Sequence, residues 1–201
     1  MTRVKFCGLS RLSDIKIANE LRSDYIGFVF SPKSKRYIIP SEAFALKRSL
    51  HPSITAVGVF VNAPIESVAT LLNNGTIEIA QLHGYEDETY IKQLRQHSNK
   101  PIIKAFQMKP DTPLALINRC TAEYVLLDSG TGSGTPFNWN LIKSLSRPYF
   151  LAGGLHKDNL STALKTLHPF AVDVSSGIET NGLKDQIKMA EFIATIRKED
   201  I

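Results

Sequence analysis

Four short apolar runs of this chain end in Lys5-Phe6-Cys7-Gly8, Asp128-Ser129-Gly130, Ala152-Gly153-Gly154 and Ser175-Ser176-Gly177. They belong to a series of eight runs, each followed by an amphipathic stretch, that divides the 201 residues into units of about 25. Each run is too short and too apolar for a helix, so the series predicts strands at 3–7, 24–30, 54–61, 76–82, 101–106, 123–128, 148–152 and 170–175. This repetition predicts an α/β fold, a (β/α)8 TIM barrel that forms a single domain over residues 1–201. In such a barrel the loops after the strands carry the chemistry.

Between the predicted strands, apolar residues recur every three to four positions, as they do along one face of a helix. The clearest examples are Leu12-Ile15-Ile17-Leu21, Val68-Leu71-Leu72 and Ile187-Met189-Phe192-Ile193. Helix starts are predicted at Ser13-Asp14, Pro40-Ser41-Glu42, Pro64 and Asp111. At these positions a side-chain oxygen can accept a hydrogen bond from a free backbone amide, or a proline presets the backbone of the first turn. We therefore expect eight helices whose apolar faces cover the outside of the barrel.

The composition is that of a globular protein, with 43% hydrophobic and 21% charged residues. The formal net charge is +5 and the pI is 9.2, but the lysines and arginines are scattered, which argues against a nucleic-acid partner. No apolar run reaches the ~18 residues of a membrane span and no secretory leader precedes the first strand, so we expect no membrane partner and a cytoplasmic location. Both cysteines, Cys7 and Cys120, are expected to be free thiols, and no cluster of side chains has metal-ligand spacing.

Strand alternation places a thiol and a carboxyl at the mouth of the barrel. In the first strand Lys5 and Cys7 share one face, while Val4 and Phe6 share the apolar face expected to meet the helices. By the same count Asp128 ends the sixth strand pointing inward, so that it and Cys7 can face one substrate. The structural alternatives are a buried ion pair between Asp128 and Lys5, and a Cys7 that is only a small hydrophobic residue.

Glycine-containing loops follow the seventh and eighth strands, where barrels commonly bind phosphate through backbone amides and a helix N-terminus. The candidate phosphate-binding residues there are Gly153, Gly154, Ser175, Ser176 and Gly177. Tight turns are the alternative explanation for these glycines. The glycine-rich loop at 130–135 is expected to be a mobile cover over the mouth, and it lacks the Gly-Lys-Ser/Thr of a nucleotide-binding P-loop.

Three further polar side chains lie at predicted strand ends or in the loops that follow them. Arg36 belongs to a basic loop, 31–37, after the second strand, where a guanidinium can engage a carboxylate or phosphate with two parallel hydrogen bonds. A solvated surface loop is the alternative. Gln81 and His83 share a face at the end of the fourth strand, and a lone histidine at a rim is more often a hydrogen-bonding scaffold than a base.

The motifs at these strand ends resemble, in their order, those of the phosphoribosylanthranilate isomerase family. They are Lys5-Phe6-Cys7-Gly8-Leu9-Ser10, Gly27-Phe28-Val29-Phe30, Ser31-Pro32-Lys33-Ser34-Lys35-Arg36-Tyr37, Gly58-Val59-Phe60-Val61-Asn62, Gln81-Leu82-His83-Gly84, Leu127-Asp128-Ser129, Leu151-Ala152-Gly153-Gly154-Leu155 and Val172-Asp173-Val174-Ser175-Ser176-Gly177-Ile178-Glu179. The resemblance spans nearly the whole chain.

The resemblance implies an isomerase of tryptophan biosynthesis that needs no cofactor. Its reaction is an Amadori rearrangement of N-(5-phosphoribosyl)anthranilate to 1-(2-carboxyphenylamino)-1-deoxyribulose 5-phosphate, with Asp128 as general acid and Cys7 as general base. For Cys7 to act as a base near neutral pH, we expect Lys5 to lower its pKa. The glycine and serine backbones named above are expected around the phosphate.

We expect a further set of side chains to bind the rest of the substrate. The substrate-binding set is Lys5, Arg36, Gln81, His83 and Asp173, with Arg36 near the anthranilate carboxylate and Asp173 in a sugar-hydroxyl or network role. The expected partner is a small anion that carries a carboxylate and a phosphate, which the positive net charge would steer inward. A minimal barrel has few insertions from which to build an interface, so we expect a monomer.

Two other functions remain open from the sequence. One is the related isomerase of histidine biosynthesis, whose two-phosphate substrate calls for two phosphate loops in related halves of the barrel. The other is a barrel without catalysis that binds a phosphate ligand or RNA, because a fold alone does not fix a function. Cys120 lies outside either scheme and is expected to be structural.

Overall fold

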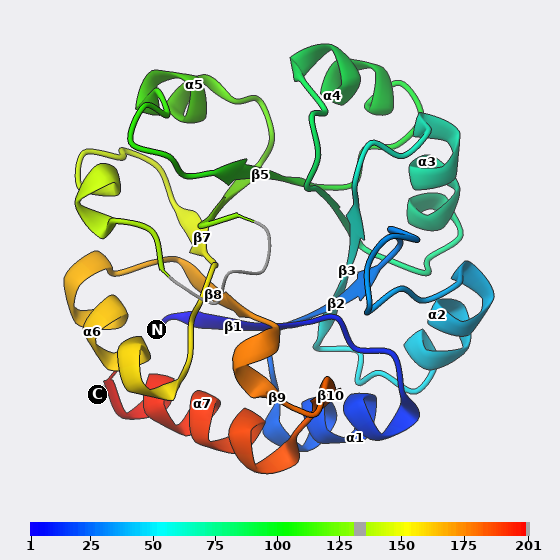
Figure 1. Ribbon diagram of the computed structural model, residues 1–201. Coiled ribbons are helices and arrows are strands. Elements are labelled where there is room, and N and C mark those ends of the chain that lie inside the picture. Colours follow the sequence, from blue (N-terminus) through cyan, green and yellow to red (C-terminus); the bar gives the residue numbers. More distant parts are fainter. Residues whose placement is uncertain (131–135, 200–201) are drawn as a thin grey trace.

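The computed structural model describes residues 1–130 and 136–199. Eight parallel strands close into a barrel in sequential order, and the helices form a ring outside it (Figure 1). The strands are β1 (Arg3–Cys7), β2 (Tyr25–Val29), β3 (Thr55–Phe60), β4 (Ile79–Leu82), β5 (Ile102–Gln107), β6 (Tyr124–Asp128), β7 (Tyr149–Leu151) and β8 (Ala171–Val174). The predicted (β/α)8 barrel is confirmed, and every predicted strand overlaps an observed one.

The outer ring is less regular than the prediction. Its members are α1 (Leu12–Leu21), α2 (Pro40–Lys47), α3 (Ile65–Asn73), α4 (Glu88–Leu94), α5 (Leu114–Arg119), the 3₁₀ helix η1 (Trp139–Ile142), α6 (Lys157–Leu167), the 3₁₀ helix η2 (Ser176–Ile178) and α7 (Gln186–Glu199). The expectation of eight α-helices is wrong, because the described residues between β6 and β7 form only η1. There the Asn138 side chain accepts the Asn140 amide, a turn contact that competes with helix, and Pro148 closes the segment.

Two observed element starts differ from the predicted ones because a turn precedes each of them. The fourth strand begins at Ile79 rather than at 76, because Thr76 donates from its amide and its hydroxyl to the Asn74 side chain and forms a turn. The fifth helix begins at Leu114 rather than at Asp111, because the Thr112 amide closes a turn onto the Lys109 carbonyl. The starts predicted at Pro40 and beside Pro64 are confirmed.

The helices bury the apolar faces that the sequence predicts, with exceptions at their first turns. Val68, Leu71 and Leu72 of α3 are buried, as are Met189, Phe192 and Ile193 of α7. By contrast, Leu12 and Ile187, near the starts of α1 and α7, are exposed. The first turns of α1 and α7 lie at the rim of the barrel. Only the later turns of these helices pack against its outer surface.

An aromatic floor fills the barrel at the amino ends of its strands. Phe150 is fully buried at the centre of this floor, with its ring centroid 5.3 Å from that of Tyr25, 5.8 Å from that of Tyr124 and 5.6 Å from that of Phe170. The Arg3 guanidinium stacks over the Phe170 ring at 4.3 Å. Because the floor is packed, a ligand can reach the interior only from the carboxyl ends of the strands.

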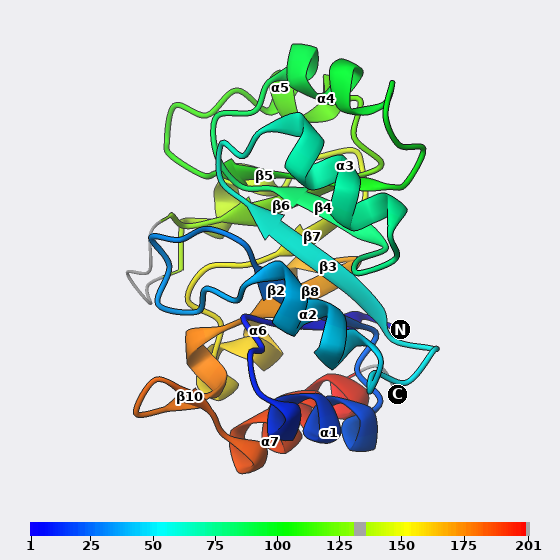
Figure 2. The ribbon, with the colours of Figure 1, turned by 90° about the vertical axis from the view of Figure 1, so that its right-hand side faces the viewer.

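A two-stranded hairpin that the sequence analysis did not predict follows β8. It pairs β9 (Glu179–Thr180) with β10 (Leu183–Lys184) through Asn181 and Gly182, whose φ values of 52° and 78° fit a tight hairpin turn. Figure 2 shows the hairpin and the loop between β2 and α2 projecting from the same end of the barrel, opposite the N-terminus. These two segments therefore border the mouth.

Replacing Phe150 with alanine should destabilise the protein by about 3–5 kcal/mol, because the phenyl ring fills the floor and its removal leaves a cavity. The free energy of unfolding in urea measures this loss. The matched control is Ile187→Ala, at a side chain that is 70% exposed, which should change stability by no more than about 0.5 kcal/mol. Equal losses in the two variants would contradict the packed floor.

Candidate active site

Lys5 and Cys7 point into the barrel, as the alternation of β1 predicts. The Lys5 ammonium is fully buried, and its Nζ donates to Asp173 Oδ1 at 2.9 Å across the β1–β8 pair, in which the two residues are in register. The alternative pairing of Lys5 with Asp128 is therefore wrong. A Cβ atom at Gly27 would lie 2.8 Å from the Cys7 Sγ and 3.2 Å from the Lys5 Nζ, so this glycine leaves space that the thiol and the ammonium share.

The charge state of the thiol differs from the prediction. Burial raises the pKa of Cys7, and the nearby Lys5 and Lys184, which lower it, do not offset that effect. Burial by itself lowers the pKa of Lys5, but the ion pair with Asp173 and the proximity of Cys7 raise it overall. Lys5 thus acts in the predicted direction, but the expected net fall of the Cys7 pKa is wrong, because burial outweighs the two lysines and favours the thiol.

Asp128 lies at the end of β6 and joins a chain of hydrogen bonds with Gln81 and His83. Its Oδ2 is 3.1 Å from the His83 Nε2, and the His83 Nδ1 is 2.9 Å from the Gln81 Nε2. With the Gln81 amide nitrogen as donor, Nδ1 accepts and Nε2 carries the proton that points at Asp128. The Gly130 amide donates to the other carboxylate oxygen at 3.1 Å. The structure therefore brings three predicted site residues together at the carboxyl ends of β4 and β6.

Arg36 reaches over the mouth and is held by a residue that the sequence analysis did not single out. Its Nε and Nη2 donate to Glu179 Oε1 and Oε2 at 2.6 and 2.7 Å, a two-pronged contact. A Cβ atom at Gly8 would collide with the Arg36 side chain, so the guanidinium stem lies against the backbone next to Cys7. Within the described residues Nη1 has no acceptor, which leaves the Nη1–Nη2 edge available to a ligand.

Lys184 is the second functional candidate that the sequence analysis missed. Its buried Nζ donates to Glu179 Oε1 at 2.6 Å and to the Ser175 carbonyl at 2.9 Å, and the Ser175 hydroxyl donates to the Cys7 carbonyl at 3.0 Å. Burial lowers the pKa of Lys184, whereas hydrogen bonds from Arg36 and Lys184 lower the pKa of Glu179 against its own burial. The Asn181-Gly182 dipeptide is a strong sequence signal for a hairpin, and a hairpin there pairs Glu179 with Lys184 across its two strands.

The two predicted phosphate loops lie against each other. Gly153 and Gly154 have φ values of 83° and 66°, and a Cβ atom at Gly177 would collide with the Leu155 carbonyl. The amides of Gly153, Gly154, Ser176 and Gly177 donate no hydrogen bond within the described part of the chain. The loops thus present free donors at one place on the rim, although the Ser175 hydroxyl is already engaged.

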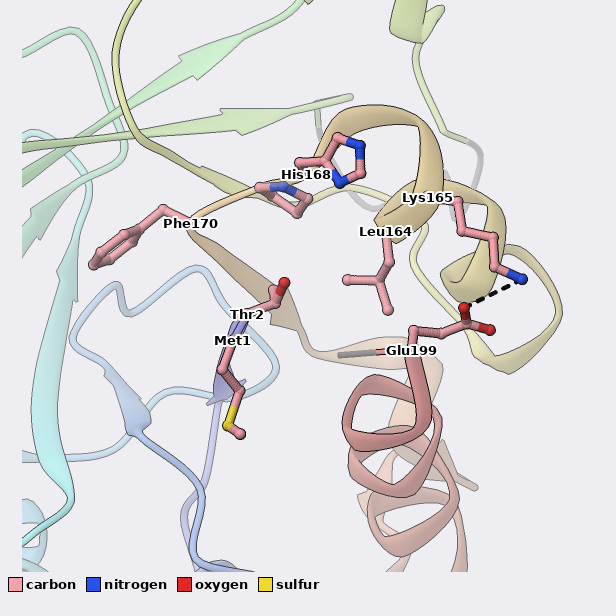
Figure 3. A pocket seen from close by; sticks show the side chains of 8 residues that line it. Met1, Thr2, Leu164, Lys165, His168, Phe170 and Glu199 are labelled. Atoms are coloured by element: carbon pink, nitrogen blue, oxygen red, sulfur yellow. Dashed lines mark ion pairs between the residues drawn. The ribbon is translucent and has the colours of Figure 1, made fainter. Parts of the chain in front are cut away.

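A cavity of about 780 Å³ adjoins this site and is bordered by His83, Asp128 and Gly130. A smaller one, of about 330 Å³, lies at the opposite end of the barrel beside Phe170 and the Lys165–Glu199 ion pair (Figure 3). None of the predicted site residues lines the smaller cavity. The predicted site residues thus lie away from this cavity, toward the carboxyl ends of the strands.

The remaining expectations concern thiols, metals and membranes. Cys7 and Cys120 are both free and buried, as predicted, and Cys120 packs in the outer core. In residues 1–130 and 136–199 there is no group of three or more His, Cys, Asp or Glu side chains that could hold a metal ion, and no helix there is long and apolar enough to cross a membrane. The predicted cover at 130–135 falls, beyond Gly130, outside the described residues.

Comparison with known proteins agrees with this arrangement. The family model described as N-(5'phosphoribosyl)anthranilate (PRA) isomerase matches residues 4–195. The chain belongs to this family. The N-(5'-phosphoribosyl)anthranilate isomerase of Endomicrobium trichonymphae is 41% identical, over 98% of this chain and 99% of its own. The predicted resemblance is confirmed, and the histidine-pathway alternative is not supported.

Two solved structures of phosphoribosylanthranilate isomerases cover 98% of this chain and 100% of their own. One contains monomers generated from the dimeric protein of Thermotoga maritima, with a TM-score of 0.87 and 35% identity. The other holds reduced 1-(o-carboxyphenylamino)-1-deoxyribulose 5-phosphate, with a TM-score of 0.88 and 34% identity. The isomerase fold therefore extends over nearly the whole of this chain.

Cys7 should react with iodoacetamide more slowly than free cysteine at about pH 7, because burial raises its pKa and the thiolate is the nucleophile. The rate should rise with pH as the thiolate forms, throughout the range from about pH 7 to about pH 9. Mass spectrometry of the Cys120→Ser variant measures Cys7 alone, and the unfolded variant is the control. A rate independent of pH would contradict the raised pKa.

Proposed function

We propose that this chain catalyses the Amadori rearrangement of its family, with Asp128 as the general acid and Cys7 as the general base. The observation that carries this proposal is the placement of the two groups. β1 and β6 are separated by β7 and β8 on one side of the closed barrel, so their ends face each other across the mouth. An acid and a base can thus act from opposite sides on one bound sugar.

The first step is ring opening. Asp128 gives its proton to the furanose oxygen, the bond between that oxygen and C1′ breaks, and the nitrogen lone pair forms the C1′=N bond of a protonated Schiff base. The resulting Asp128 carboxylate then accepts hydrogen bonds from the His83 Nε2 and the Gly130 amide, which stabilise its charge. Gln81 fixes the histidine tautomer that makes this possible.

The second step is proton abstraction from carbon. The Cys7 thiolate removes the C2′ proton, the electron pair of that bond forms the C1′=C2′ bond, and the Schiff-base nitrogen recovers its lone pair. The enolamine then takes a proton at C1′ and loses one from the C2′ hydroxyl to give the ketone. Lys5 and Lys184 stabilise the thiolate, and the pairing of Lys5 with Asp173 holds the ammonium beneath it.

The two ends of the substrate match the two free donor sets. The open Nη1–Nη2 edge of Arg36 would bind the anthranilate carboxylate, while Glu179 holds the other edge. The amides of the loops after β7 and β8 would bind the phosphate, whose charge of about −1.5 to −2 suits a cluster of free N–H groups. The relative that holds the reduced ribulose phosphate has a ligand with the same two anionic ends. A cytoplasmic monomer remains a prediction.

Asp128→Asn and Cys7→Ala should each lower kcat by about a hundredfold or more, because each removes a proton-transfer group and leaves the anion contacts in place. The assay follows loss of anthranilate fluorescence from freshly made N-(5-phosphoribosyl)anthranilate. Cys120→Ser is the matched control and should keep wild-type kcat, because this thiol packs in the outer core. Full activity in both site variants would exclude the assigned roles.

In the Asp128→Asn variant, which removes the assigned acid, the residual kcat/KM should rise with pH between about pH 6 and about pH 9. The thiolate forms as pH increases, and a pKa raised by burial moves this increase to more alkaline pH. The pH profile of the residual kcat/KM of Asp128→Asn tests this, with solvent viscosity varied to confirm that chemistry limits the rate. A profile that falls with pH over this range would exclude Cys7 as the base of the free enzyme.

A further inference from the structure

Two buried charges outside the barrel interior take no part in the proposed chemistry. Lys104 lies on the outward face of β5, and Glu86 lies in the loop between β4 and α4. Their Nζ and Oε2 atoms are 3.3 Å apart, and the two side chains are only 9% and 1% exposed. Burying such a pair costs free energy of desolvation, which its hydrogen bonds to the backbone help to offset.

The pair holds both peptide units that flank His83. The Lys104 Nζ donates to the Leu82 carbonyl at 3.4 Å, which belongs to the peptide unit before His83, and to the Gly84 carbonyl at 2.8 Å. Glu86 Oε2 accepts the Gly84 amide, in the peptide unit after His83, at 2.8 Å. Because the two flanking peptide planes fix φ and ψ of the residue between them, the backbone of His83 is set by this ion pair.

The same carboxylate ties this loop to its neighbour after β3. Glu86 Oε1 accepts the Asn62 amide at 2.6 Å, and the Asn62 side chain accepts the Tyr85 amide at 2.7 Å. Asn62 has a φ of 52°, and a Cβ atom at Gly84 would collide with it, so the two loops are in close contact. Lys104 and Glu86 also border the cavity that His83 and Asp128 line.

We propose that Lys104 and Glu86 are positioning residues that act through His83 on the Asp128 carboxyl. This inference rests on the roles proposed above for His83 and Asp128. A hydrogen bond of 3.1 Å between the His83 Nε2 and Asp128 leaves little tolerance, because a shift of about 1 Å would break it. The ion pair adds to the backbone hydrogen bond from the His83 amide to the Phe60 carbonyl, at 2.8 Å, in holding this loop in place.

The test is a double-mutant cycle between Lys104→Met and His83→Ala, with kcat and KM measured for the family substrate. Lys104→Met should lower kcat by roughly tenfold to a hundredfold and change KM by less than about twofold. In the His83→Ala background the same substitution should change kcat by less than about twofold, because no imidazole remains to be misplaced. A purely structural role would instead lower kcat by the same factor in both backgrounds.

The matched control is Arg95→Met, which removes the Arg95–Glu123 ion pair at the amino end of β5. It lowers stability without touching His83, so it should keep wild-type kcat. A wild-type kcat in Lys104→Met, or in His83→Ala, overturns the inference. Absence of turnover in the wild type would overturn the proposed function instead, so the two failures are distinguishable.

If Lys104→Met does not fold, the double variant Glu86→Gln with Lys104→Gln replaces it, since it removes both charges and leaves no unpaired ion. The ¹⁵N chemical shifts of the His83 ring in this variant provide the second readout. They should move toward a mixture of tautomers, because Nδ1 and Nε2 no longer keep their partners. Unchanged ring shifts together with unchanged kcat would overturn the inference.

Discussion

The buried ion pair between Lys5 and Asp173 is the constraint on which the rest of the site depends. It lies inside the barrel across the β1–β8 pair, which is the seam where the first and last strands of the barrel meet. Removing one partner of such a pair leaves an uncompensated buried charge, at a cost of about 3–5 kcal/mol. The pair therefore joins closure of the barrel to the electrostatics of the thiol above it, because the Lys5 ammonium and Cys7 share the space beside Gly27.

Other charges at the rim are also paired, and the pair of Arg36 with Glu179 leaves one edge of the guanidinium free for a ligand. Glu179 bridges Arg36 and Lys184, which fixes the guanidinium and leaves its end edge open. The His83 ring contacts one oxygen of Asp128, and the Gly130 amide contacts the other. Such preorganisation is valuable in a site that must stabilise a cationic Schiff base and then an enolamine without rearranging between the steps.

The sequence predicted the barrel well because each strand is a short run with a distinct apolar pattern. It also placed Cys7, Asp128 and the two loops predicted to bind phosphate at the carboxyl ends of their strands, where the structure has them, because that placement follows from strand order alone. It did not reveal Glu179 and Lys184 as a pair, since their importance depends on contact with Arg36, 143 positions from Glu179 along the chain. The raised pKa of Cys7 could not be predicted from the sequence either, because it depends on how far burial in the folded barrel outweighs the two nearby lysines.

The most direct test of the account is a crystal structure of the Cys7→Ala variant with reduced 1-(o-carboxyphenylamino)-1-deoxyribulose 5-phosphate bound. The account predicts the phosphate on the amides of Gly154 and Gly177, the carboxylate on the free edge of Arg36, and the sugar carbons between residue 7 and Asp128. A ligand bound with its sugar carbons away from Asp128, or with its phosphate away from the two glycine loops, would contradict the account.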